Sequence, residues 1–303
     1  MPKFGFCDTI LGPFDLEFQN QYFNGWPTLD GGPYRIVMAF PVEGTDTAAA
    51  VTVSQPAADT VQGDLYGTHA EETAQKAWRQ ALAALSLDAD GSGWPEVGQR
   101  DKTLGKLQQH YNYMRPSLFH SPYEAATSFV VGHRISIVQA RKLRERIAEQ
   151  YGHKVEVEGT TFHAFPTPQQ VLAGGEIGLV NPTKSARLLA IAQASLDGWL
   201  DREHLRDLPE DSALALLNTL PGIGPFFAQG ILQRGAGTAD GMTLDDMTLA
   251  AISASYPEVG GKPTIADALA LAEPWRPYRM WATVLLHVWM RQTNLVPKLR
   301  RRR

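Results

Sequence analysis

The chain has 303 residues, a formal net charge of −4 and 44% hydrophobic residues, enough apolar material for one large or two to three small domains. The single cysteine, Cys7, excludes an internal disulfide and a four-cysteine iron–sulfur cluster, and it favours a reducing cytoplasm. No apolar run reaches the roughly 20 residues that a membrane-spanning helix needs, and the first residues lack the layout of a secretion signal. We therefore expect a cytoplasmic protein without a membrane partner.

The net negative charge argues mildly against DNA binding by bulk attraction, but the charge is unevenly spread. The segment 137–146 and the tail 298–303 are strongly basic, whereas acidic residues cluster elsewhere. An acidic protein can bind DNA when its basic groups lie on one side. Charge alone thus leaves nucleic-acid binding open.

Residues 1–75 are rich in Gly, Pro, Asp and Thr and contain two runs typical of strands, 34–40 and 48–54. They predict a small, mostly antiparallel sheet, followed by a helix at about 70–86. From about 101 onward the patterns are helical, at 101–112, 122–132, 136–151, 167–173, 183–196, 209–218, 224–234, 246–256, 263–271 and 275–292.

This order predicts an α+β fold, with a small β-containing N-terminal domain packed on an all-α core. We predict an N-terminal domain over 1–112, a helical core over 113–292 and a basic tail over 293–303. The core contains a candidate helix-hairpin-helix at 210–234.

The stretch Leu220-Pro221-Gly222-Ile223-Gly224-Pro225 separates two amphipathic helical patterns. Glycines on both sides of an apolar residue allow a tight turn, in which Ile223 points inward. The N–H groups of Gly222, Gly224 and the next helix then face outward and can cradle a phosphate. The pattern predicts a DNA-binding hairpin; an αα-hairpin turn without nucleic acid is the alternative.

About twenty residues later, a glycine-rich stretch at 235–241 leads to Asp245 and Asp246, where another helical pattern begins. The helix dipole keeps a carboxylate at such a position ionised. An ionised carboxylate can stabilise an oxocarbenium-like sugar and orient water. We expect Asp245 to be the N-cap, which makes Asp246 the candidate for chemistry.

These segments resemble the helix-hairpin-helix–Gly/Pro–Asp superfamily of DNA glycosylases and, within it, the 3-methyladenine DNA glycosylase II family. The resemblance is clearest over 118–292 and depends on LPGIGPFFA, RGAGTAD, LDD, WRPYRMWATVLLHVW, FVVGHRIS and the KSARLL helix. It implies an enzyme that flips an alkylated base out of double-stranded DNA and hydrolyses its N-glycosidic bond, and it implies a monomer.

The resemblance also implies roles for single residues. Asp246 falls on the catalytic Asp, Trp289 on a Trp near the flipped base, and Phe226 on an aromatic position beside the pocket. Bifunctional relatives carry at that last position a Lys that attacks the sugar, so Phe226 implies a glycosylase without lyase activity. Tyr278 and Tyr22 are further candidate walls of the base pocket, because aromatic rings stack on an alkylated, cationic base.

His133 and Arg134 lie in a predicted loop where the family inserts a wedge into DNA. The family's wedge is often apolar, so Arg134 departs from it, and a phosphate contact is the alternative role. No cofactor is required for the chemistry. The resemblance implies a Na⁺ or K⁺ ion held by hairpin carbonyls near Asn218, Leu220 and Ile223.

Two other functions stay open at this point. One is a helix-hairpin-helix protein that binds DNA and lacks chemistry, against which Asp246 argues. The other is a monofunctional glycosylase for deaminated or oxidised bases, which Phe226 does not exclude. Arg276 and Arg279 are expected to pair with carboxylates rather than to contact DNA.

Overall fold

The computed structural model describes residues 4–22, 25–30, 32, 34–67 and 70–295, and the chain forms two compact units. The sheet unit combines Met1–Thr9, Trp26–Asp88 and Ser117–Gly237, and the helical unit combines Ile10–Gly25, Ala89–Pro116 and Thr238–Arg303. The two units alternate along the chain, unlike the predicted succession of segments. The boundaries at 112 and 292 therefore stay predictions, and most of the basic tail lies outside the described residues.

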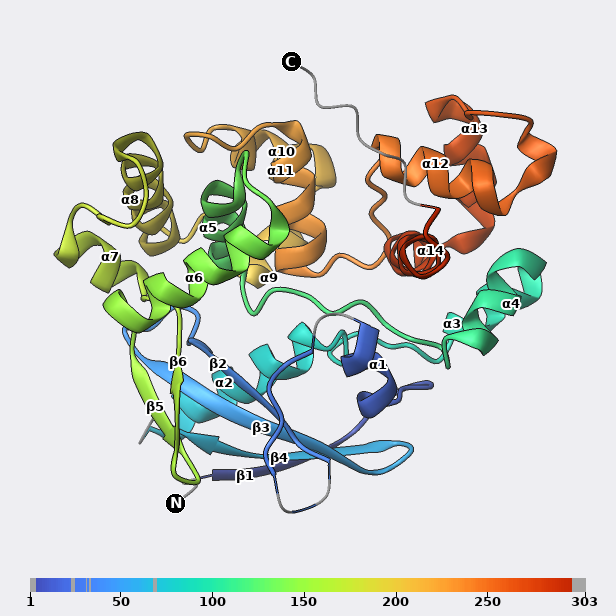
Figure 1. Ribbon diagram of the computed structural model, residues 1–303. Coiled ribbons are helices and arrows are strands. Elements are labelled where there is room, and N and C mark those ends of the chain that lie inside the picture. The colour runs from blue at the N-terminus through green and yellow to red at the C-terminus, as the bar shows by residue number, and fades with distance from the viewer. Residues whose placement is uncertain (1–3, 23–24, 31, 33, 68–69, 296–303) are drawn as a thin grey trace. The chain divides into compact units, whose positions relative to one another are not determined.

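The described strands of the sheet unit include a four-stranded antiparallel sheet in the order β1-β4-β3-β2 (Figure 1). Its strands are β1 (Phe4–Thr9), β2 (Ile36–Pro41), β3 (Ala48–Ala57) and β4 (Thr60–Tyr66). The two predicted strands are β2 and β3, whose apolar runs are almost wholly buried. The antiparallel sheet predicted from the sequence is thus confirmed.

Helix α2 (Glu71–Ala84) packs one face against this sheet. Its buried side consists of alanines, Gln80 and Trp78, and the Trp78 ring stacks on Phe6 of β1 with centroids 5.4 Å apart. The Trp78 indole N–H donates to the carboxylate of Asp8. An aromatic ring therefore anchors the helix to an edge strand.

The remaining helices of the sheet unit surround a second apolar core. They are α5 (Pro122–Gly132), α6 (Ile137–Tyr151), α7 (Pro168–Gly174), α8 (Pro182–Leu196), α9 (Arg202–Asp207), α10 (Glu210–Asn218), α11 (Pro225–Gly230) and a π-helical turn (Ile231–Ala236). Side-chain caps begin α5, α6, α7 and α8, as Ser, Thr and Asn before a helix predict.

A β-hairpin interrupts this helical region, so the prediction of an all-α core was wrong here. It consists of β5 (Lys154–Val157) and β6 (Thr160–His163). Glu158 and Gly159 make the turn with φ of 48° and 87°, and Val155 and Val157 are buried in a small apolar cluster. Strands of four residues give too short an alternation to be seen in the sequence.

The helical unit is built from chain segments that are far apart in sequence. Its helices are α1 (Leu16–Tyr22), α3 (Trp94–Arg100), α4 (Lys102–His110), α12 (Asp246–Ser255), α13 (Ile265–Ala272), α14 (Arg279–Gln292) and two 3₁₀ turns (Pro257–Val259 and Glu273–Trp275). Asp101 joins two of its segments: one carboxylate oxygen caps α4, and the other accepts from Trp275 Nε1 and Tyr256 OH, both at 2.8 Å. In neither unit is any described helix both long and apolar enough to cross a bilayer.

Candidate active site and nucleic-acid interface

The hairpin between α10 and α11 has the geometry that its sequence predicts. Ile223 is buried, and its N–H donates to the Leu220 carbonyl at 3.0 Å, which closes the turn. Gly222 and Gly224 flank it on the surface, and Gly222 has φ of 86°, a left-handed value that favours glycine. Helix α11 begins without a side-chain cap, so its first N–H groups have no side-chain partner.

Phe226, at the first turn of α11, exposes 54% of its surface. The next residue, Phe227, stacks on Phe129 of α5 with ring centroids 5.0 Å apart. A Cβ built on Gly230 would lie 2.6 Å from Cζ of Phe129. The Phe129 ring therefore fills the space beside Gly230.

The predicted wedge loop connects α5 to α6 in the same unit. Arg134 is exposed and has φ of 61°, while His133 is half-buried and makes a T-shaped contact with the Phe227 ring, with centroids 5.9 Å apart. Lys184 of α8 holds this loop, since its ammonium donates to the carbonyls of Val131 (2.7 Å) and His133 (2.9 Å). A left-handed backbone costs a non-glycine residue about 1–2 kcal/mol, and these two bonds fix the chain just before Arg134.

Arg187, one turn further along α8, lies against the hairpin. A Cβ built on Gly222 would lie 2.6 Å from Cδ of Arg187 and 2.7 Å from its Nε. The wedge loop, the start of α8 and the hairpin therefore form one continuous surface, which we call the loop–hairpin surface. Lys184 and Arg187 were not predicted individually, because only the folded chain brings α8 beside the hairpin.

Asp245 and Asp246 occupy different environments at the start of α12. The Asp245 side chain accepts from the Thr248 N–H at 2.7 Å and is the N-cap, as predicted. The side chain of Asp246 is 76% exposed, and Lys262 Nζ donates to its Oδ1 at 2.8 Å. Lys262, which precedes α13, was not predicted as a partner of Asp246.

The loop before α12 is fixed to the start of α14. Arg279 Nε donates to Asp240 Oδ1 at 2.9 Å, Arg276 pairs with the same carboxylate, and the Met280 N–H donates to the Ala239 carbonyl at 2.9 Å. The prediction that both arginines pair with carboxylates is confirmed. Together with Asp245 at the N-cap, this anchoring fixes the backbone from which Asp246 projects.

The other predicted pocket residues of the helical unit differ in exposure. Trp289 on α14 is half-buried. Tyr278 is 6% exposed, its hydroxyl donates to the Asp90 carbonyl at 2.7 Å, and its ring packs against Trp281 with centroids 4.9 Å apart. It lies in the core of its unit, so a role as a pocket wall stays a prediction. The side chain of Tyr22 lies outside the described residues.

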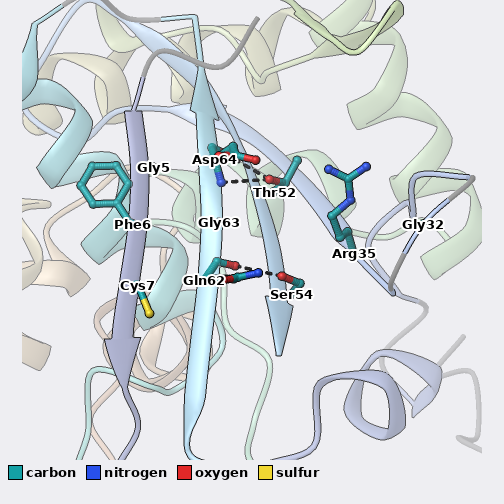
Figure 2. A pocket seen from close by; sticks show the side chains of 10 residues that line it. All are labelled: Gly5, Phe6, Cys7, Gly32, Arg35, Thr52, Ser54, Gln62, Gly63 and Asp64. Atoms are coloured by element: carbon teal, nitrogen blue, oxygen red, sulfur yellow. Dashed lines mark hydrogen bonds between the residues drawn. The ribbon is translucent and has the colours of Figure 1, made fainter. Parts of the chain in front are cut away.

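A separate cavity of about 600 Å³ lies on the face of the sheet (Figure 2). Two of its hydroxyl groups are bonded to the backbone of β4: Thr52 Oγ1 accepts from the Asp64 N–H at 3.0 Å, and Ser54 Oγ donates to the Gln62 carbonyl at 3.4 Å. Arg35 at its rim makes a bidentate pair with Glu158. The cavity contains none of the predicted site residues.

No protein-family model matches the chain. It is 32% identical over 171 residues to DNA-3-methyladenine glycosylase 2 of Escherichia coli, a match that covers 55% of this chain and 56% of that protein. It is 26% identical over 206 residues to DNA-3-methyladenine glycosylase of Bacillus subtilis, covering 67% of this chain and 68% of the relative. The alignment thus spans little more than half the length of the first of these relatives.

The fold is similar to that of a solved 3-methyladenine DNA-glycosylase from Archaeoglobus fulgidus. The TM-score is 0.77 at 21% sequence identity, over 96% of this chain and 100% of the other. The sequence is thus similar to those of two 3-methyladenine DNA glycosylases, and the fold is that of a solved glycosylase of the same description.

Proposed function

We propose that the protein is a monofunctional DNA glycosylase that removes alkylated bases of the 3-methyladenine type from double-stranded DNA. The observation that carries the proposal is the pair of carboxylates at the start of α12. The Asp245 side chain caps α12, while the Asp246 side chain is exposed in the first turn of that helix. Similarity to proteins named DNA-3-methyladenine glycosylase supports the choice of base.

The chemistry requires few protein groups. The bond between C1′ and the base nitrogen breaks, and an alkylated purine, which is already cationic, leaves as a neutral base without needing an acid. The sugar becomes oxocarbenium-like, and the Asp246 carboxylate stabilises that charge. Water adds to C1′ and gives up a proton, which Asp246 can accept and pass to solvent, leaving an abasic site.

DNA would contact the loop–hairpin surface. Extrusion of a nucleotide costs a few kcal/mol, and a side chain that enters the vacated space offsets part of this cost. We assign that role to Arg134, because it is exposed in the wedge loop and a planar guanidinium can stack on bases. Ile137, in the first turn of α6, is 78% exposed and adds an apolar contact next to it.

Phe226 supports hydrolysis without lyase activity, since its ring cannot form a Schiff base with the sugar. We further propose that Na⁺ or K⁺ binds at the hairpin through backbone carbonyls of Asn218, Leu220 and Ile223. The donor set fits such an ion, because carbonyl oxygens at the C-terminal end of α10 carry the negative end of the helix dipole. Such an ion would place a positive charge beside a bound phosphate.

The single cysteine fits a reducing compartment, and we propose a monomer in the cytoplasm. The decisive experiment incubates the protein with alkylated duplex DNA, quantifies the released bases by chromatography, and tests the products for strand breaks before and after alkali. We expect release of 3-methyladenine or 7-methylguanine, with breaks only after alkali. Binding to an abasic-analogue duplex without release of these bases would refute the alkylated-base activity.

A further inference from the structure

A cavity of about 470 Å³ lies between the wedge loop and the start of α8. His133 and Arg134 line it from the loop, and Thr183, Lys184 and Arg187 line it from α8. Its lining has four basic side chains and no acidic one. The wedge residue and the arginine that covers Gly222 of the hairpin thus share one cavity.

The positive charge of this cavity is not neutralised within the described part of the chain. Neither Arg134 nor Arg187 makes an ion pair or hydrogen bond with any described residue. Lys184 makes two hydrogen bonds, both to neutral carbonyls, so it keeps its full charge and a third N–H. Burial and then the charges of Arg134, Arg187 and Lys184 lower the pKa of His133, and burial and Arg187 lower the pKa of Lys184.

Such a set of donors is suited to a phosphate group. Guanidinium groups bind phosphate oxygens bidentately, an ammonium adds a point charge, and the Thr183 hydroxyl near the start of α8 is exposed and can donate. Arg187 lies against Gly222 of the hairpin and also lines the cavity, which favours a phosphate that belongs to a polymer already held by the hairpin over a free anion.

We propose that this cavity binds a backbone phosphate of duplex DNA, as a phosphate subsite separate from the hairpin amides. Arg187 and Lys184 are its principal residues, and Lys184 also positions the wedge by holding the carbonyls of Val131 and His133. The inference rests on the proposed function, because it assumes that DNA lies across the loop–hairpin surface. It adds an electrostatic contact to a protein whose net charge of −4 disfavours DNA binding by bulk attraction.

The test measures the equilibrium affinity for an abasic-analogue duplex across a range of salt concentrations, for wild type, Arg187→Gln, Arg187→Lys and the control Arg79→Gln. Arg79 is an exposed arginine on α2. Loss of one phosphate contact lowers the slope of log affinity against log salt by about 1. We expect this change for Arg187→Gln, with about tenfold weaker binding at moderate salt, and near-wild-type slopes for the other two variants.

A second measurement locates the phosphate. Neutral methylphosphonate linkages are placed one at a time along each strand; one of them should weaken binding by the wild type and leave Arg187→Gln unaffected. If Arg187→Gln does not fold, as judged by thermal melting, Arg134→Gln removes a charge from the same cavity and should lower the slope similarly.

The outcomes separate this inference from the proposed function. If the wild type excises alkylated bases but Arg187→Gln keeps the full salt slope and the full methylphosphonate response, the subsite is absent although the glycosylase stands. If inorganic phosphate at constant ionic strength raises the melting temperature of wild type but not of Arg187→Gln while the DNA slopes agree, the cavity binds a free anion and the DNA subsite is overturned. If the wild type binds no duplex, the proposed function fails first.

Discussion

At the scale of single residues, the two adjacent aspartates at the start of α12 show what the sequence can and cannot predict. Capping preference assigned Asp245 to the helix, and its bond to the Thr248 N–H confirms this. The partner of Asp246 was not predictable, because Lys262 lies 16 residues further on and is brought back by the turns after α12. A sequence pattern predicts hydrogen bonds between neighbouring residues far better than it predicts contacts between residues that a loop brings together.

The ion pair between Lys262 and Asp246 is exposed on both sides, at 66% and 76%. Exposed pairs contribute little to stability, and a positively charged sugar would compete with Lys262 for the same carboxylate. We therefore expect Lys262→Gln to leave the melting temperature almost unchanged and to alter base release by only a few-fold. A loss of release as large as that caused by removing the Asp246 carboxylate would show instead that Lys262 takes part in the reaction.

At the scale of elements, the hairpin contains two glycines that look equivalent in the sequence but differ in backbone conformation. Gly222 needs its left-handed φ of 86°, whereas Gly224 has φ of −103° and open space where a Cβ would stand. We predict that Gly222→Ala lowers the free energy of unfolding by about 1–2 kcal/mol, while Gly224→Ala leaves it nearly unchanged.

DNA binding should respond differently to these two substitutions. If a phosphate approaches the hairpin backbone, Gly224→Ala weakens binding without loss of stability, because the added methyl group faces the ligand. Denaturant unfolding and a duplex-binding titration on the same preparations check both expectations. Equal losses of stability in the two variants would contradict this account of the turn.

Helix α5 carries a buried charged group in its first turn. The Glu124 carboxylate binds His120 Nδ1 at 2.6 Å and Arg144 of α6 at 2.5 Å. Burial alone would raise the pKa of Glu124, but its interactions with His120 and Arg144 outweigh burial and lower the pKa from 4.5 to about 2. The stabilisation is therefore present above about pH 4.5 and is lost as the pH falls toward 2.

We predict that the unfolding free energy of wild type falls between pH 5 and pH 3 more steeply than that of Glu124→Gln. Such a carboxylate takes up its proton over the range from about pH 5 to about pH 2. At neutral pH, Glu124→Gln should cost about 3 kcal/mol, because Arg144 loses its partner. The matched control is Glu145→Gln, which removes an exposed carboxylate from α6, the helix that carries Arg144. Parallel pH profiles for wild type and Glu124→Gln would refute the assignment.

The elements missed by sequence analysis all have weak local patterns, for different physical reasons. Strand β4 (TVQGDLY) contains Gly and Asp, which are poor in strands, and β1 is an edge strand that is mostly exposed. Helices α1 and α3 have only seven residues each, too few for a clear helical period. By contrast, α5 and α6 were predicted to within one residue, since each is capped and begins after a turn.

At the scale of the whole molecule, the alternation of the two units along the chain could not be read from sequence. Asp101 accepts hydrogen bonds from Trp275 and Tyr256, both buried, and Arg115 is fully buried, with its guanidinium donating to the carbonyls of Leu11, Pro13 and Ala89. Local patterns carry no information on such pairings. The helical unit thus depends on residues before 113.

We therefore predict that a fragment of residues 113–303 does not fold cooperatively, although it contains both the hairpin and Asp246. It lacks Asp101, which accepts hydrogen bonds from Trp275 and Tyr256. Each unsatisfied buried donor costs about 1–3 kcal/mol. Near-ultraviolet circular dichroism and thermal melting of the fragment, compared with the full chain, check this. A cooperative transition of the fragment near the melting temperature of the full chain would contradict it.

The central claim is that Asp246 is the catalytic carboxylate, and one measurement tests it most directly. Release of 3-methyladenine from alkylated duplex DNA is compared among wild type, Asp246→Asn and Asp245→Asn, with binding to an abasic-analogue duplex measured in parallel. Asn caps helices about as well as Asp, so Asp245→Asn should keep near-wild-type release. Asp246→Asn should bind DNA but release base at least ~100-fold more slowly. Equal release by Asp246→Asn and wild type would contradict the account.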